Sequence, residues 1–316
     1  RFRVGASIGI VGVEQPAGSL EHALQRADAA CFAAKDGGRN RVCVAEEEAA
    51  VPGEANAGEV HWAQRLRIAL ERNDFALFGQ PMKALDKSTS ARHCEVLLRL
   101  RDNDGQPTVL PGAFLPVADR YGLASELDRW VIAQLASRVQ RQGAPRVDHF
   151  WINLSPATLE DDTFAHEVEQ LIATHGLAPG TLNFELREIA ALRHADAIAP
   201  ALQALKALGC RIAIDAFAGG TSSFECLRQL PIDMIKIDGS HVRAVGEDPI
   251  DRIFVRAMIE AANELGLRSC AMHTESPESI NAVLELGADY AQGHAIAAPQ
   301  PLFTEHLAAD RSGVAA

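Results

Sequence analysis

The chain has 316 residues, of which 47% are hydrophobic and 23% are charged, and its formal net charge is −12. This composition is typical of a globular protein and excludes a disordered chain. The acidic balance argues against a nucleic-acid polymer or an anionic membrane surface as the main partner. No run approaches the ~20 apolar residues of a transmembrane helix, and the six cysteines form no CxxC pair. We therefore expect a cytoplasmic protein with reduced thiols.

Residues 1–44 are expected to form a strand, a loop, a helix over 20–35 and a short strand over 41–44. About forty residues are too few for an independent core, and the sequence opens directly on strand-like residues, so we expect the end of a larger domain. The stretches 7–10 and 27–42 resemble the C-terminal end of a GGDEF (diguanylate cyclase-like) domain. The metal and nucleotide residues of that family would lie upstream, so the resemblance implies no cyclase activity.

Residues 45–60 are acidic and small and are interrupted by Pro52 and Gly53, a composition typical of a linker. A barrel domain is expected over 61–310, beginning with a helix at 61–73, and a short tail over 311–316. Within the barrel domain, short apolar runs alternate with amphipathic segments. The runs expected to be strands are 75–82, 94–100, 149–155, 182–188, 210–217, 234–240, 268–274 and 290–296. The segments expected to be helices include 127–142, 159–175, 192–208, 251–265 and 278–286.

Eight strands alternating with helices over about 230 residues favour an α/β fold, a modified (β/α)8 TIM-like barrel, over an open doubly wound sheet. The connection over 83–93 is polar and too short for a crossover helix. We therefore expect the first two strands to pair antiparallel.

Polar residues lie at or near the ends of almost all of these strands. They are Glu95, Arg99, Asn153, Glu185, Glu188, Asp215, Lys236, Asp238, Glu275 and Gln292. Each one alone is explained by pairing or capping, but burying so many without partners costs about 1–3 kcal/mol for each unsatisfied group. Carboxylates together with an Asn amide oxygen suit Mg²⁺ or Mn²⁺. The pattern thus predicts a barrel with a metal- or phosphate-binding mouth.

Short stretches in the same order carry a second resemblance. They are Gln80-Pro81, 95–100, 111–116, 128–130, 153–155, 184–188, Asp215 with 221–224, 236–239 and Gln292-Gly293. On these stretches, residues from about 62 to 303 resemble an EAL domain, the phosphodiesterase that opens cyclic di-GMP to a linear dinucleotide. Glu95-Val96-Leu97 replaces Glu-Ala-Leu and keeps the glutamate. A GGDEF-like tail joined to this domain by a linker is a common arrangement in that family.

The resemblance implies a role for each matching residue. Lys236 matches the residue that orients the attacking water, and Glu188 matches the anchor of the loop after Asp215. Four residues match metal ligands: Glu95, Asn153, Glu185 and Asp215. Five match the nucleotide site: Gln80, Arg99, Asn153, Asp238 and Gln292. The implied reaction is two-metal hydrolysis, in which a pair of ions activates water and clamps the phosphoryl oxygens.

Some positions depart from the family pattern. Where the family has two consecutive aspartates this chain has Asp215-Ala216, and where it has Ala-Glu-Gly-Val-Glu the chain has Met272 and His273 at the second and third positions. Alanine is no ligand and a thioether is a poor one for Mg²⁺. Ala218 replaces a loop glycine and removes its freedom for positive φ. His273 lies one residue after the position of the family's glutamate ligand. A shift of one residue turns a strand side chain to the opposite face, so we expect His273 to be a packed or exposed residue and not a replacement ligand.

The sequence therefore indicates a catalytically degenerate EAL domain that acts as a cyclic di-GMP receptor or regulatory signalling module. Two alternatives stay open: an active, Mg- or Mn-dependent cyclic di-GMP phosphodiesterase, and a nucleotide-independent interaction scaffold. The metal expected is Mg²⁺ or Mn²⁺, or none if the incomplete site has lost its affinity. The expected partners are cyclic di-GMP, a second copy of the chain through the barrel, and a signalling protein.

Overall fold

The structure is a computed structural model and describes residues 8–11, 42–44, 54–85, 91–102, 105–142 and 147–303. The chain divides into two compact units, Arg1–His61 and Trp62–Ala316. In the first unit β1 (Ile8–Ile10) pairs in parallel with β2 (Val42–Val44), so strands form at both ends of the predicted pattern. The helix predicted over 20–35 and the tail predicted over 311–316 lie outside the described residues.

The helix predicted over 61–73 is present but starts earlier, because α2 spans Glu54–Arg72. Residues 54–60 of the predicted linker are therefore helical. In the part of α2 that belongs to the second unit, Ala63, Leu66 and Ala69 recur at three-residue spacing and are buried in the main core. This spacing places them on one face of the helix.

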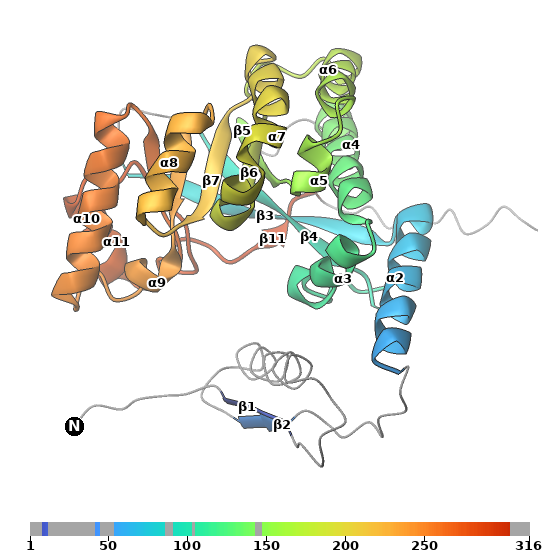
Figure 1. Ribbon diagram of the computed structural model, residues 1–316, viewed down its shortest axis with the longest axis horizontal. Coiled ribbons are helices and arrows are strands. Elements are labelled where there is room, and N and C mark those ends of the chain that lie inside the picture. Colours follow the sequence, from blue (N-terminus) through green and yellow to red (C-terminus); the bar gives the residue numbers. More distant parts are fainter. Residues whose placement is uncertain are drawn as a thin grey trace, which may run out of the picture. The chain divides into compact units, whose positions relative to one another are not determined.

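Eight strands close into a barrel in the second unit (Figure 1). They are β3 (Phe75–Ala84), β4 (His93–Leu100), β5 (His149–Asn153), β6 (Leu182–Arg187), β7 (Ile212–Phe217), β8 (Met234–Ile237), β9 (Arg268–Ala271) and β10 (Tyr290–Ala291). β3 runs antiparallel to both of its barrel neighbours, β4 and β10, and the other neighbouring strands run in parallel. A further strand, β11 (Gln300–Pro301), also pairs with β3. The predicted TIM-like barrel with an antiparallel first pair is confirmed.

Helices follow the parallel strands and cover the outside of the barrel. They are η1 (Pro111–Ala113), α3 (Leu115–Arg120), α4 (Ala124–Gln142), α5 (Pro156–Leu159), α6 (Phe164–His175), α7 (Glu188–Ala207), α8 (Thr221–Gln229), α9 (Gly239–Val242), α10 (Pro249–Glu264) and α11 (Pro277–Glu285). The helix predicted over 159–175 is present as α6 but begins later, at Phe164, and Leu159 is the last residue of the separate short helix α5. Asp161 accepts hydrogen bonds from the backbone and hydroxyl of Thr163, and this turn separates α5 from α6.

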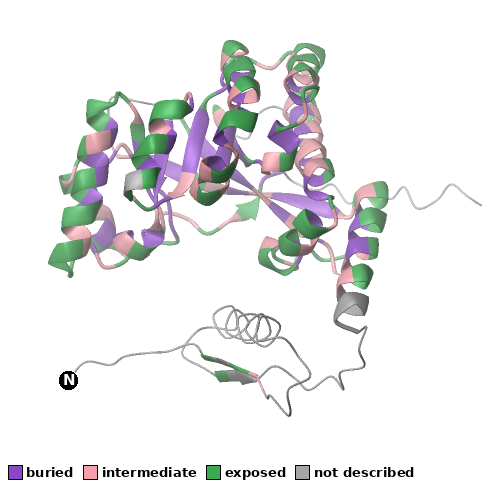
Figure 2. Cartoon of the chain, in the orientation of Figure 1, coloured by how far each residue is buried: buried purple, intermediate pink, exposed green. Residues whose placement is uncertain are grey.

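Apolar side chains on the outer faces of the strands pack under the helices and form the main core. Figure 2 shows the barrel strands buried along most of their length, while the helices expose their outer faces. The inward-facing residues Met82, Trp151, Ala213, Met234, Cys270 and Tyr290 form a separate, smaller cluster inside the barrel. None of the helices in the described parts of the chain combines the length and apolar character needed to cross a membrane.

Candidate functional site

The candidate site is a layer of inward-facing side chains near the carboxyl ends of the parallel strands. Side chains alternate between the two faces of a strand, so a residue two positions after a member of the interior cluster faces the interior again. This rule places Lys236 above Met234 and Met272 above Cys270. The layer consists of Gln80, Glu95, Asn153, Glu185, Asp215, Lys236, Met272 and Gln292. The members other than Gln80 and Met272 are predicted by the pattern of polar strand ends in the sequence; Gln80 is predicted by the family resemblance, and Met272 is a departure from that family.

Lys236 is the centre of this layer. Its Nζ donates to Oε2 of Glu95 at 2.7 Å and to Oε2 of Glu185 at 2.6 Å. The Lys236 and Glu185 side chains have no exposed surface, and Glu95 has 9%. Three strands that are far apart in the sequence, β4, β6 and β8, are thus joined by one buried ion-pair network.

Two amides complete the contacts of Glu95. Asn153 Nδ2 donates to its Oε1 at 2.9 Å, and Gln292 Nε2 donates to its Oε2 at 2.8 Å. Gln292 Nε2 also lies 3.1 Å from Gln80 Oε1, and Gln80 Nε2 donates to the Ala297 carbonyl. The structure therefore brings together Glu95, Glu185, Lys236 and three predicted amides.

The two carboxyl groups that contact Lys236 have pKa values shifted in opposite directions. Burial disfavours the charge of Lys236, but the carboxylates of Glu185 and Glu95 outweigh it and raise the pKa of Lys236 well above its ordinary value. Burial likewise disfavours ionised Glu95, but Lys236 and the hydrogen bonds hold the pKa of Glu95 below its ordinary value. Burial, followed by the charge of Glu95, raises the pKa of Glu185. Glu95 is thus the ionised partner of Lys236, and Glu185 is the carboxyl that most readily retains a proton.

Some buried acceptors of the site have no hydrogen-bond partner. Among the described residues they are Glu185 Oε1, Gln292 Oε1 and Thr274 Oγ1. An unpaired buried polar group costs about 1–3 kcal/mol. The site therefore has unused capacity for a cation, water or a donor group of a ligand.

Other predicted residues lie around the network. Asp215 follows the inward-facing Ala213 by two positions on β7, so it belongs to the same layer as Glu185 and Lys236. The Arg99 guanidinium lies over the ring of Phe78, 5.3 Å from its centroid. Asp238 caps α9 and accepts a hydrogen bond from the Ser240 backbone at 2.7 Å. In the described part of the chain neither Arg99 nor Asp238 forms a hydrogen bond with Lys236, so both lie outside the central network.

Glu188 begins α7 and contacts the loop after β7. The Ala218 backbone N–H points at its carboxylate, with N···O distances of 3.3 and 3.4 Å. Ala218 itself does not have positive φ, so the strain expected there is absent. In the loops that follow β7 and β9, the non-glycine residues with left-handed backbone are Ala216 and His273, each with φ of 55°. The prediction for Ala218 is thus wrong by two residues, because the sharp turn comes directly after Asp215.

Met272 and His273 follow the end of β9. Met272 is partly buried and packs against the interior apolar cluster, so its thioether extends that cluster toward the polar layer. His273 is exposed and its ring packs on the backbone of Gly239, where a Cβ would overlap it. The prediction that His273 is a packed or exposed residue agrees with this placement.

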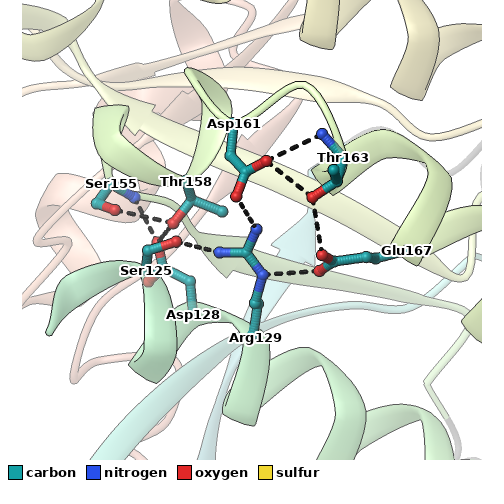
Figure 3. A network of polar contacts seen from close by, with 8 residues as sticks. All are labelled: Ser125, Asp128, Arg129, Ser155, Thr158, Asp161, Thr163 and Glu167. Atoms are coloured by element: carbon teal, nitrogen blue, oxygen red, sulfur yellow. Dashed lines mark hydrogen bonds and ion pairs between the residues drawn. The ribbon is translucent and has the colours of Figure 1, made fainter.

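A second polar network supports the loop that carries Asn153 (Figure 3). Asp128 of α4 accepts from the Ser155 backbone at 2.8 Å and from Thr158 Oγ1 at 2.6 Å. The neighbouring Arg129 donates to Asp161 and Glu167, each at 2.7 Å. In the sequence the 128–130 stretch is visible only through the family resemblance, because its contact with the start of α5 depends on how α4 packs.

Within the described residues, no three His, Cys, Asp or Glu side chains form a group that could hold a metal ion. The Lys236 ammonium lies between the candidate ligands Glu95 and Glu185 and supplies the positive charge there. Ala216 and Met272 provide no hard oxygen ligand. By donor chemistry, the residues present do not fit a pair of divalent cations.

Comparison with known proteins places this site in a family. Residues 63–299 match the model of the EAL domain. The chain belongs to the EAL family. Its EAL domain resembles the EAL domain of FimX from Pseudomonas aeruginosa, solved bound to c-di-GMP, with 29% identity and a TM-score of 0.71 over 77% of this chain and 98% of that one. It also resembles the MucR phosphodiesterase in complex with c-di-GMP, with 29% identity and a TM-score of 0.67 over 76% of this chain and 98% of that one.

Curated relatives of this EAL chain include two proteins named cyclic di-GMP phosphodiesterases. PdeB of Shewanella oneidensis is 30% identical over 95% of this chain and 35% of its own length, and PdeF of Escherichia coli is 36% identical over 77% of this chain and 32% of its own. The bifunctional diguanylate cyclase/cyclic di-GMP phosphodiesterase MucR of Pseudomonas aeruginosa is 32% identical over 95% of this chain and 43% of its own length. The chain thus spans less than half of the length of these relatives.

Proposed function

We propose that this EAL domain is a catalytically degenerate receptor that binds cyclic di-GMP and regulates a signalling partner. One observation carries the proposal: Ala216 in β7 and Met272 directly after β9 add no oxygen ligand beside Glu95, Glu185 and Asp215. Lys236 pairs with Glu95 and Glu185 in a buried network, so these carboxyl groups have a charged partner without a metal ion. The c-di-GMP bound to the FimX domain supports the same ligand here.

Nucleotide binding would use the residues around the network. Arg99 is the candidate phosphate contact, since guanidinium–phosphate hydrogen bonds are charge-assisted. Gln292 offers its free Oε1 as an acceptor, and Gln80, Asn153 and Asp238 complete the predicted nucleotide site. Neither these contacts nor base stacking requires a metal pair.

The receptor is tested by calorimetry with cyclic di-GMP in the presence of EDTA. We expect saturable binding, weakened at least tenfold by Arg99→Met because a charge-assisted contact is lost. Arg193→Met, on the exposed face of α7, is the matched control and should bind as the parent does. Absence of binding up to high micromolar nucleotide would instead favour the nucleotide-independent scaffold.

The alternative is an active Mg- or Mn-dependent phosphodiesterase. The orphaned Glu185 Oε1 and the identity with named phosphodiesterases favour it. In that case Glu95, Asn153, Glu185 and Asp215 are the candidate metal ligands, with Lys236 and Glu188 in the roles predicted from the family.

A chromatographic assay for linear dinucleotide with Mn²⁺ separates enzyme from receptor. We expect no product from the parent chain and measurable turnover from Ala216→Asp combined with Met272→Glu, because these changes restore two carboxylates. Product formation by the parent chain would overturn the degenerate assignment. If the double variant also forms no linear dinucleotide, the loss of these two carboxylates is not what prevents hydrolysis.

We also infer that residues 1–44 are the end of a GGDEF-like domain, joined by residues 45–60 to the EAL domain over 61–310. The alignment with MucR supports this, because it covers 95% of the chain and so extends beyond the EAL match at 63–299. A homodimer through the barrel, a protein signalling partner and a cytoplasmic location stay part of the proposal.

A further inference from the structure

A cavity of about 350 Å³ lies at the amino end of the barrel, opposite the candidate site. Its walls come from the first residues of several parallel strands and from the loops that lead into them. The lining residues that matter chemically are His93, His149, Arg211, Asp233, Asp289 and Tyr290. None of them belongs to the EAL site described above. The volume lies at the lower end of the ~300–1,000 Å³ typical of small-molecule pockets.

The two acidic residues of this cavity are already satisfied. Asp233 accepts from Lys206 Nζ and from the Ile212 backbone at 2.9 Å. Asp289 accepts from Arg268 and from the backbone and hydroxyl of Ser269, at 2.8 and 3.1 Å. Each carboxylate thus has its own cation and at least one backbone donor, so neither is available to balance a further positive charge.

Arg211 supplies that further positive charge. It precedes β7 and has the same parity as the inward-facing Ala213, but it is exposed, so its side chain lies at the open amino end of the barrel, where it lines the cavity. Its backbone N–H donates to Asn183, and within the described chain its guanidinium appears in none of the ion pairs. Arg211 is therefore the one lining cation whose charge the cavity leaves unbalanced, among the residues that the structure describes.

A hydrogen-bonded chain fixes the donors at the floor of the cavity. Trp151 Nε1 can only donate, and it donates to His93 Nδ1 at 3.0 Å. Neutral His93 must then carry its hydrogen on Nε2, which lies 3.3 Å from the Tyr290 hydroxyl oxygen. Burial, with the charges of His149 and Arg211, lowers the pKa of His93 to about 3, which keeps the ring neutral. Because Tyr290 accepts from His93, its own hydroxyl hydrogen is free to donate elsewhere.

His149 presents a third polar group. Its Nδ1 donates to the Gly180 carbonyl at 2.6 Å, which leaves Nε2 for other contacts. Its ring lies 4.5 Å from that of His93, centroid to centroid. A neutral His149 offers an acceptor at Nε2, and a protonated one offers a donor.

We propose that this cavity binds a small oxyanion, a carboxylate or phosphate group, through the Arg211 guanidinium and the Tyr290 hydroxyl, with His149 Nε2 as a third donor when the ring carries a hydrogen on both nitrogens. The unbalanced Arg211 charge selects an anion, and the satisfied carboxylates do not oppose it. Barrel strands β4, β5 and β8 contribute both to this cavity, through His93, Trp151 and Met234, and to the polar layer above it.

The test uses the full chain, with inorganic phosphate and acetate as separate probes and histidine-selective ¹H–¹⁵N NMR as the readout. We expect saturable shifts of the His93 and His149 ring nitrogens with at least one probe. Arg211→Met should weaken binding at least tenfold, while Arg211→Lys should retain part of it. Arg187→Met, at the opposite end of the barrel, is the matched control and should leave the titration unchanged.

Tyr290→Phe is the second variant, because it removes only the hydroxyl and keeps the ring. We expect weaker binding of the probe with an unchanged circular dichroism spectrum. Saturable shifts with phosphate alone, acetate alone or both support the site and identify its preferred anion. Lack of saturation at tens of millimolar, equal binding by Arg211→Met, or displacement of the probe by saturating cyclic di-GMP would each overturn the proposal.

Discussion

At the residue scale, the two departures from the EAL pattern that remove charge sit in or beside left-handed backbone. Ala216 and His273 each have φ of 55°, a region that costs a side chain with a Cβ roughly 1–2 kcal/mol. Asp and Gly, the family residues at these two positions, tolerate this region better. The substitutions that remove a ligand or replace glycine therefore leave the backbone turn in place and add strain to it.

The strain at Ala216 leads to a stability prediction. Ala216→Gly should raise the free energy of unfolding by about 0.5–1 kcal/mol, because glycine adopts φ of 55° without a Cβ clash and this gain exceeds its extra unfolded-state entropy. Urea denaturation followed by circular dichroism measures the change. Ala218→Gly, in the same loop but without positive φ, should lower stability; equal effects of both changes would contradict the backbone explanation.

At the scale of elements, helices hold the loops that present the candidate site. Asp128 on α4 accepts hydrogen bonds from Ser155 and Thr158 and so fixes the first turn of α5. This turn directly follows Asn153, the last residue of β5. Burial raises the pKa of Asp128 from 3.8 to about 6, although its hydrogen bonds act in the opposite direction. The folded state therefore binds a proton at Asp128 more tightly than the unfolded chain does.

This raised pKa predicts a pH dependence. The stabilisation from protonated Asp128 is fully present below about pH 4 and is lost as the pH rises through about 6. Thermal unfolding from pH 4 to pH 7 should show the parent losing about 2–3 kcal/mol relative to Asp128→Asn, which cannot ionise. The exposed Asp162→Asn is the control, and a constant difference between parent and Asp128→Asn over this range would exclude a raised pKa.

At the scale of the whole molecule, the barrel domain contains its own core and both of its polar ends. The core residues of the second unit begin in α2, with Ala63 and the fully buried Leu66. The interior cluster separates the Lys236 network at one end from the Arg211 cavity at the other. Closure of the barrel is thus what brings residues from all parts of the domain into two distinct sites.

This organisation predicts the effect of truncation. A chain that begins at residue 54 should unfold cooperatively with nearly the same midpoint as the full chain, because α2 and its buried residues are kept. A chain that begins at residue 74 loses Leu66, and truncating a buried leucine alone costs about 2–5 kcal/mol. Calorimetric scans of the two fragments test this; a large loss of stability in the longer fragment would show that residues 1–53 contribute to the barrel core.

Local patterns in the sequence were sufficient to predict the eight strands, the antiparallel first pair and the set of polar strand ends, because alternation and segment length report the face and type of each element. The contacts of Lys236 with Glu95, 141 residues away, and of Gln292 with Glu95, 197 residues away, needed the tertiary structure. So did the left-handed turn at Ala216, which the sequence placed at Ala218, and the cavity at Arg211. Periodicity shows which way a side chain faces, but only strand register and barrel closure decide which side chains meet.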